Sequence, residues 1–142
     1  MPQTGPTVFV CTGNRCRSPM AEHLARHLDP AGSYTSAGTA ARPGAPPTDA
    51  AVRALAELGI DLSGHRARSV WTLAEPGRLL VATEAHRELL RRRRAAWSDR
   101  IELLDPDGDL PDPYGGPDAR YRELRDRLVE VLTTRLRGST LR

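Results

Sequence analysis

The sequence predicts an α/β fold in which about four parallel strands form one open sheet with helices on both faces. Short apolar runs alternate along the chain with segments whose apolar residues recur at helical spacing. This alternation is the pattern of a parallel sheet whose crossover connections are helices. No internal repeat, linker or low-complexity tract interrupts it. We therefore expect residues 1–142 to form a single domain.

The first half of the chain supplies two strand–helix pairs. A buried strand is expected over residues 8–10, and a helix over 18–28 ends at the Asp-Pro pair that follows it. A second strand is expected over residues 33–36. A Pro-rich loop leads from it to a helix over 48–59, which begins at a Thr or Asp cap and ends at a glycine. Leu58 is expected on the apolar face of this helix.

The second half repeats the alternation. Residues 63–70 read as a loop followed by a short helix or strand, and the sequence leaves these two open. A buried strand is expected over 78–82, with Thr83 capping a helix that runs to about Arg94. A short strand over 100–104 follows. The last helix begins at Asp118 and continues to about Arg137, with its apolar residues in one stripe.

Composition limits the class of protein. The 142 residues carry 39% hydrophobic and 27% charged side chains, and no apolar run is long enough to span a membrane. The net charge is +3, and all 21 basic residues are arginine. This charge suits an anionic substrate but does not indicate a nucleic-acid-binding surface. The opening MPQTGPTVFV lacks the features of a secretory signal, so we expect a cytoplasmic protein that binds neither nucleic acid nor membrane.

A cysteine at the end of the first strand defines the candidate site. Cys11 is followed by five residues and then Arg17, and the expected helix begins at Ser18. The first amides of a helix have no internal partner, and successive amides of a tight loop form a nest for phosphate-like oxyanions. The same field favours the nucleophilic thiolate of Cys11, and the Arg17 guanidinium can chelate two phosphate oxygens.

This stretch resembles a known signature. The segment from Cys11 to Pro19 is similar to the C-x5-R-[ST] loop of the low-molecular-weight protein tyrosine phosphatases. The resemblance implies a metal-free, cofactor-free hydrolysis in which Cys11 attacks the phosphoryl group of a phosphorylated protein and forms a cysteinyl phosphate. It implies phosphate binding by the loop residues Thr12, Gly13, Asn14, Arg15, Cys16, Arg17 and Ser18. It also implies that Cys16 can form a reversible, protective disulfide with Cys11.

The aspartate-rich stretch 105–117 supplies a candidate proton donor. A phosphate ester needs its leaving oxygen protonated, and one carboxyl group can then activate the water that hydrolyses the intermediate. The segment from Asp112 to Tyr114 resembles the family's general-acid loop, which makes Asp112 the acid and later base and places Tyr114 at the pocket mouth. A calcium loop is excluded because Leu110 and Gly116 replace the glycine and glutamate that it requires.

The loop also needs bracing. Asparagine tolerates left-handed backbone torsions and can hydrogen-bond sideways, so Asn14 is a suitable brace. The resemblance implies that Asn14 bonds a histidine and serines, and the matching positions are His65, Ser36 and Ser18. For His65 alone, a core or surface histidine is the alternative. His23 and His27 lie four apart on the first helix, but no H-E-x-x-H pattern accompanies them, so we expect exposed histidines and no metal site.

The substrate remains open between related classes. Phosphotyrosine is the first interpretation, and protein phosphoarginine is the alternative, because Gly115-Gly116 after Tyr114 resembles the family's arginine phosphatases. Arg15 departs from both branches, which carry an aliphatic residue or a threonine there. Thiol-dependent arsenate reductases share the fold and the C-x5-R loop, but those with internal relays need cysteines beyond Cys16, and this chain has none.

Overall fold

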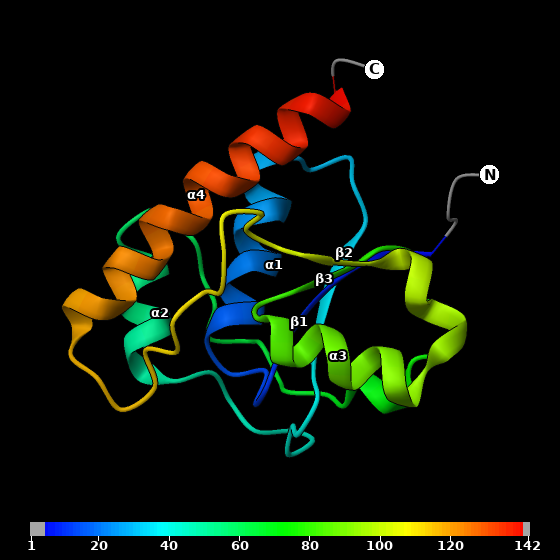
Figure 1. The fold of residues 1–142 in the computed structure, drawn as a ribbon. Coiled ribbons are helices and arrows are strands. Elements are labelled where there is room, and N and C mark those ends of the chain that lie inside the picture. The colour runs from blue at the N-terminus through cyan, green and yellow to red at the C-terminus, as the bar shows by residue number, and fades with distance from the viewer. Residues whose placement is uncertain (1–4, 141–142) are drawn as a thin grey trace.

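The predicted four-stranded parallel sheet is present. The computed structural model describes residues 5–140, and its sheet has the order β2-β1-β3-β4 with every neighbouring pair parallel. Figure 1 shows β1, β2 and β3 in the middle of the fold, among the helices. The strands are β1 (Thr7–Cys11), β2 (Tyr34–Gly38), β3 (Leu79–Val81) and β4 (Ile101–Leu103).

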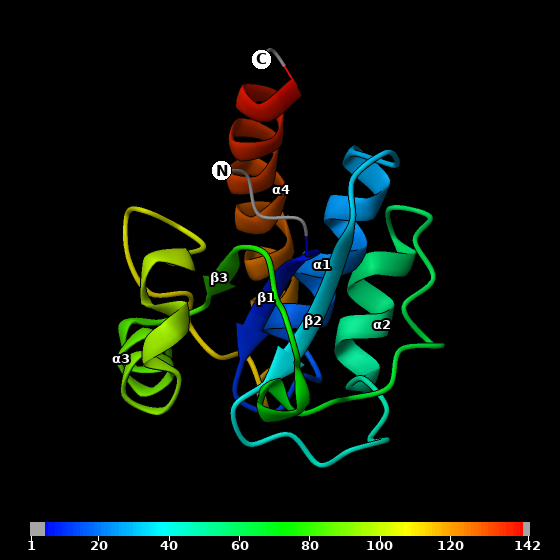
Figure 2. The same cartoon turned by 90° about the vertical axis from the view of Figure 1, so that its right-hand side faces the viewer.

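Helices cover both faces of this sheet. The α-helices are α1 (Arg17–Leu28), α2 (Asp49–Ala56), α3 (Glu84–Arg93) and α4 (Asp118–Thr140), and two 3₁₀ segments are η1 (Val70–Thr72) and η2 (Ala95–Arg100). Figure 2 shows α1, α2 and α4 on one side of the strands and α3 on the other. Within residues 5–140, no helix is long and apolar enough to cross a bilayer.

Alternate residues of β1 pack into two separate hydrophobic cores. Phe9 and Cys11 face α1, α2 and α4, whereas Val8 and Val10 face α3 and η2. This is the period of two that a strand imposes on its side chains. Burying each large apolar side chain contributes about 1.5–3 kcal/mol. Because both faces are buried, β1 lies in the centre of the protein, and the loop that follows it starts from a rigid support.

The strand order explains where a ligand can bind. β1 pairs with β2 along one edge and with β3 along the other, so the connections leave it in opposite directions. In open parallel sheets this switch point, at the carboxyl ends of the strands, is the usual ligand site. Cys11 is the last residue of β1 and therefore lies at that point.

Several expected element boundaries need correction. β2 continues through Gly38, because that residue pairs with Cys11, instead of ending before it. The helix expected over 48–59 ends at Ala56, and Leu58 is therefore 42% exposed instead of buried. The alternative left open near residue 70 resolves as the 3₁₀ segment η1. The caps at Thr48 and Thr83 are confirmed, since each side chain accepts an N–H of the first turn.

Candidate active site

The loop between β1 and α1, here called the phosphate loop (residues 12–17), has the features of an anion nest. The N–H groups of residues 13–16 donate no hydrogen bond within the described chain, residues 5–140. Asn14 has φ 56°, the only positive φ of a non-glycine residue described. A left-handed residue in a tight turn can direct successive N–H groups toward one point. The loop can therefore bind an oxyanion through its backbone.

Cys11 lies at the base of this loop with a polar partner. Its side chain is buried, and Sγ is 2.9 Å from Oγ of Ser18 in the first turn of α1. Ser18 Oγ accepts a hydrogen bond from Asn14 Nδ2 at 2.8 Å. The hydroxyl proton of Ser18 has two acceptors within reach, the Cys11 sulfur and, at 3.5 Å, the carbonyl of Ala37. The sulfur is the nearer of the two.

Asn14 holds the loop through four hydrogen bonds. Its Nδ2 donates to Ser18 and to Ser36 of β2 (2.9 Å), and its Oδ1 accepts the N–H of Arg68 at 2.9 Å. Its carbonyl accepts from His65 Nε2 at 2.9 Å. The structure thus brings together all four residues expected to support the loop. The Arg68 contact was not foreseen. Its donor is a backbone N–H, which nearly every residue type carries, so the sequence does not show which one is used.

Arg17, the last residue of the phosphate loop, is buried. Its Nη1 donates to the carbonyl of Leu110 at 3.2 Å, and Nη2 lies 3.6 Å from Oδ2 of Asp112. Its Nε has no hydrogen-bond partner among residues 5–140, although the side chain is only 7% exposed. A buried guanidinium donor costs free energy unless an acceptor meets it. A phosphate oxygen in the loop is such an acceptor.

Asp112 reaches the phosphate loop from a distant part of the chain. Its carboxylate is half exposed, and Oδ1 accepts the N–H of Tyr114 at 3.1 Å. The thiol of Cys16 points to the same oxygen, with Sγ 3.7 Å away. Burial, followed by the nearby Cys11 and Asp112, raises the pKa of Cys16 to about 12. Cys16 therefore stays protonated at neutral pH, unlike a reactive cysteine.

Arg15 and Tyr114 form the rim. Arg15 Nε donates to the carbonyl of Pro46 at 2.7 Å, and its guanidinium lies 6.0 Å from the centre of the Tyr114 ring. Tyr114 is 63% exposed, so its ring is available to a substrate. Such exposed cation–π contacts contribute about 0.5–1 kcal/mol.

His86 is a site residue that the sequence analysis missed. Its Nε2 lies 2.8 Å from Oγ1 of Thr12, and its Nδ1 lies 2.8 Å from Oγ1 of Thr83. Burial, followed by the charge of Arg17, lowers the pKa of His86 to about 4. A neutral imidazole therefore ties the phosphate loop to the start of α3. No motif could reveal it, because Thr12 and His86 are far apart in the sequence.

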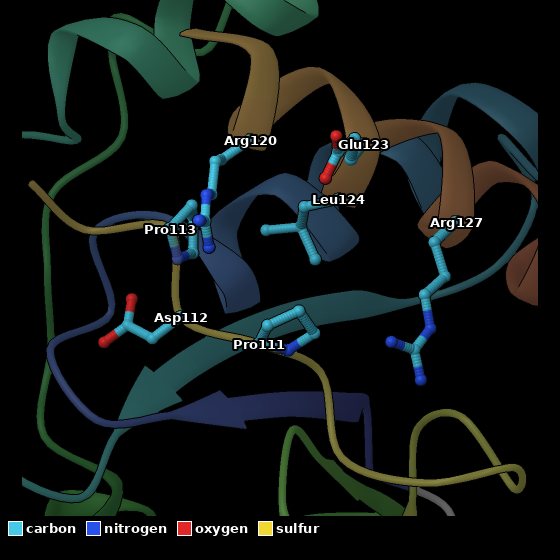
Figure 3. Close-up of a pocket in the computed structure, with 7 residues that line it drawn as sticks. All are labelled: Pro111, Asp112, Pro113, Arg120, Glu123, Leu124 and Arg127. Atoms are coloured by element: carbon cyan, nitrogen blue, oxygen red, sulfur yellow. The ribbon is translucent and has the colours of Figure 1, made fainter. Parts of the chain in front are cut away.

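A groove of about 210 Å³ adjoins the site on the far side of the Asp112 segment. Figure 3 shows it between that segment and α4, with the Asp112 carboxylate pointing away from Leu124 and Arg127. Asp112 is the only predicted site residue among those that line it. The groove is therefore separate from the phosphate loop.

An anion-binding loop that carries its own nucleophile is the arrangement of a cysteine-dependent phosphatase. The sequence model of the family described as low molecular weight phosphotyrosine protein phosphatase matches residues 7–139. The chain belongs to this family, as its sequence led us to expect, and is a phosphatase.

Named relatives lie in both branches of the family. The chain is 35% identical over 135 residues to a protein-arginine-phosphatase of Bacillus subtilis, covering 88% of this chain and 90% of that protein. It is 36% identical over 148 residues to a low molecular weight protein-tyrosine-phosphatase of Streptomyces coelicolor, covering 90% and 88%. Overall similarity therefore does not separate the two substrates.

A solved structure agrees with the fold. The tyrosine phosphatase Wzb from Escherichia coli K30 in complex with phosphate matches with a TM-score of 0.83 and 28% identity. The match covers 91% of this chain and 88% of that one.

Proposed function

We propose that this protein hydrolyses phosphotyrosine in proteins through a cysteinyl-phosphate intermediate. The observation that carries the proposal is the convergence of three groups on one loop: the Cys11 sulfur, the Arg17 guanidinium and the Asp112 carboxylate. Binding alone would need the first two groups only. A carboxyl group beside an anion nest supplies the proton that a leaving phenoxide requires.

The phosphoryl group binds first. Its equatorial oxygens accept from the N–H groups of residues 12–17 and from Arg17, whose planar fork suits two oxygens. The phosphate complex of the Escherichia coli relative supports oxyanion binding at this kind of site. Because these donors are fixed before the substrate arrives, they stabilise the charge of the transition state without reorganisation.

Two displacements then follow. The Cys11 thiolate attacks phosphorus in line, the bond to the tyrosine oxygen breaks, and Asp112 gives its proton to that oxygen. Asp112, now a carboxylate, takes a proton from water, which attacks the cysteinyl phosphate and releases inorganic phosphate and the thiolate. Ser18 stabilises the thiolate at both ends of the cycle.

The rim favours phosphotyrosine over phosphoarginine. Tyr114 offers an exposed ring on which an aryl substrate stacks, and the Arg15 guanidinium lies beside it. A cation at this point repels the guanidinium of phosphoarginine and attracts the π face of an aromatic ring. Protein-arginine phosphatase activity is the second candidate, supported by the Bacillus subtilis relative and by the Gly115-Gly116 doublet.

The proposal includes a cytoplasmic location. Cys11 and Cys16 are both free thiols in the structure. The mechanism needs the reduced form of Cys11, which a reducing compartment maintains.

Leaving-group dependence tests the role of Asp112. Asp112→Asn removes the proton donor and should lower kcat/KM, which reports formation of the cysteinyl phosphate, on phosphotyrosine peptide by about 10²–10⁴-fold. The loss of kcat/KM should be much smaller on an aryl phosphate whose leaving phenol is strongly acidic, because that oxygen needs no proton. An equal loss on both substrates would contradict the assignment of Asp112 as general acid.

A substrate panel separates the candidates. Wild-type protein should release phosphate from phosphotyrosine peptide with a chelator present, and faster than from phosphoarginine peptide. Arg15→Thr should shift the ratio of kcat/KM values toward phosphoarginine. A wild-type preference for phosphoarginine would replace the first candidate by the second, and thiol-dependent arsenate reduction without phosphatase activity would reject both.

A further inference from the structure

Two histidines and a carboxylate meet behind the phosphate loop. Glu22 and His23 are neighbours on α1, and His65 comes from the segment between α2 and η1. One potential ligand atom from each lies within 4.8 Å of those of the other two. From their spacing on the first helix, His23 and His27 were both expected to be exposed. The structure contradicts this for His23, which is 19% exposed and packs against the ring of His65.

His65 is already oriented as a metal ligand. Its Nε2 lies 2.9 Å from the carbonyl oxygen of Asn14, and a carbonyl can only accept, so Nε2 carries the proton. In the neutral ring Nδ1 is then unprotonated, and its lone pair is free to bind a metal ion. Nδ1 lies 4.0 Å from Oε1 of Glu22. A histidine whose second nitrogen donates to a backbone carbonyl is the usual arrangement around a bound metal ion.

The carboxylate is held in a similar way. The Ser36 hydroxyl donates to Oε1 of Glu22 at 2.6 Å, and Arg26 lies 2.7 Å from Oε2. His23 Nε2 is 3.8 Å from the same Oε2. Glu22 is buried, whereas His23 reaches the surface, so an ion can enter from the side of His23.

We propose that Glu22, His23 and His65 bind a divalent transition-metal ion, through one carboxylate oxygen and one nitrogen of each imidazole. Imidazole and carboxylate suit Zn²⁺, which binds both at about 2.0–2.2 Å in tetrahedral sites. Ligand atoms of such a site are roughly 3.3 Å apart. The 3.8 Å from His23 is measured to Oε2 and the 4.0 Å from His65 to Oε1, and one ligand atom from each of the three residues lies within 4.8 Å of the others. The ligand atoms therefore need to approach one another by up to about 1.5 Å.

This ion takes no part in the chemistry at Cys11. Its ligands reach the phosphate loop in two ways: His65 holds the Asn14 carbonyl through its other nitrogen, and Glu22 accepts from Ser36, which accepts from Asn14 Nδ2. The charged groups nearest the site are Arg26, which competes for Glu22, and Arg66 and Asp61 in the segment that carries His65. Removing Arg26 should therefore tighten the site, because Oε2 then faces the ion without a competing cation.

Calorimetric titration of the full chain with Zn²⁺, after chelator treatment, tests the proposal. We expect one ion per chain in the wild type, and affinity at least about tenfold lower in His23→Ala and in His23→Gln, which keeps the bulk of the side chain. His27→Ala is the matched control, since it removes an exposed histidine one turn away and should bind as the wild type does.

The active-site thiols need a separate control. Cys11→Ser should bind Zn²⁺ with unchanged affinity, and Arg26→Ala should bind it more tightly. Absence of binding in the wild type would overturn the proposal, as would equal binding in both His23 variants. Loss of binding in Cys11→Ser alone would assign the ion to the thiol instead, and would equally overturn it.

Discussion

Replacing Asn14 probes the bracing of the phosphate loop most directly. Asn14→Ala removes the three side-chain hydrogen bonds, to Ser18, Ser36 and the Arg68 N–H, while the carbonyl bond to His65 remains. It also places alanine, whose side chain cannot form a local hydrogen bond, in the left-handed region at φ 56°. Asn14→Gly removes the same three bonds but has no Cβ and adopts this torsion freely.

The two variants separate bonding from backbone strain. Each buried hydrogen bond contributes about 0.5–1.5 kcal/mol net, so both variants should lose about 3 kcal/mol of unfolding free energy. Alanine in the left-handed region costs about 1 kcal/mol more than glycine. For a chain of this size, 3 kcal/mol corresponds to a fall in Tm of roughly 10 °C.

Urea unfolding at pH 7.5 and phosphate binding measure the two consequences. Asn14→Gly should be more stable than Asn14→Ala, and both should bind inorganic phosphate more weakly than the wild type, because the loop amides are no longer held toward one point. If Asn14→Ala unfolds within about 1 kcal/mol of the wild type and binds phosphate equally well, the bracing argument is wrong.

Other parts of the structure give three further predictions. The folded-state pKa of His86, about 4, lies below its ordinary value of 6.5, so the unfolded chain takes up the proton first and stability falls as pH drops from 6.5 toward 4. Between pH 7.5 and 5 the wild type should lose about 2 kcal/mol more than His86→Gln in urea unfolding, and equal losses would refute this. Thr48→Ala removes the α2 cap and should cost about 1 kcal/mol, whereas Thr48→Ser, which keeps the acceptor, should cost little. Peroxide treatment should give a Cys11–Cys16 disulfide by mass spectrometry, and sulfonate on Cys11 alone would count against it.

The sequence was most informative where local chemistry decides the structure. The run from Val8 to Arg17 specifies strand, loop and helix through apolar burial, turn residues and cap geometry, which all act within a few residues. Asp112 could be matched because its loop chemistry is equally local. These segments gave the fold class and the candidate catalytic residues without knowledge of the tertiary structure.

Contacts that depend on packing between distant segments escaped prediction. His23 was expected on an exposed helix face, but the segment after α2 covers it with His65. His86 became a partner of Thr12 only because β1 and β3 are neighbours in the sheet. Leu58 was misplaced by the early end of α2. In each case the residue type suits several environments, and the tertiary structure selects one of them.

The proposed mechanism requires the phosphoryl group to pass through the Cys11 sulfur. Rapid acid quench of a reaction with labelled phosphotyrosine peptide, followed by peptide mass spectrometry, measures this directly. We expect a phosphoryl group on Cys11 during turnover and no turnover in Cys11→Ser. With an aryl phosphate whose leaving phenol is strongly acidic, Asp112→Asn should accumulate more of this intermediate, because only the hydrolysis step then needs the missing carboxylate. Phosphate release that persists in Cys11→Ser would contradict the account.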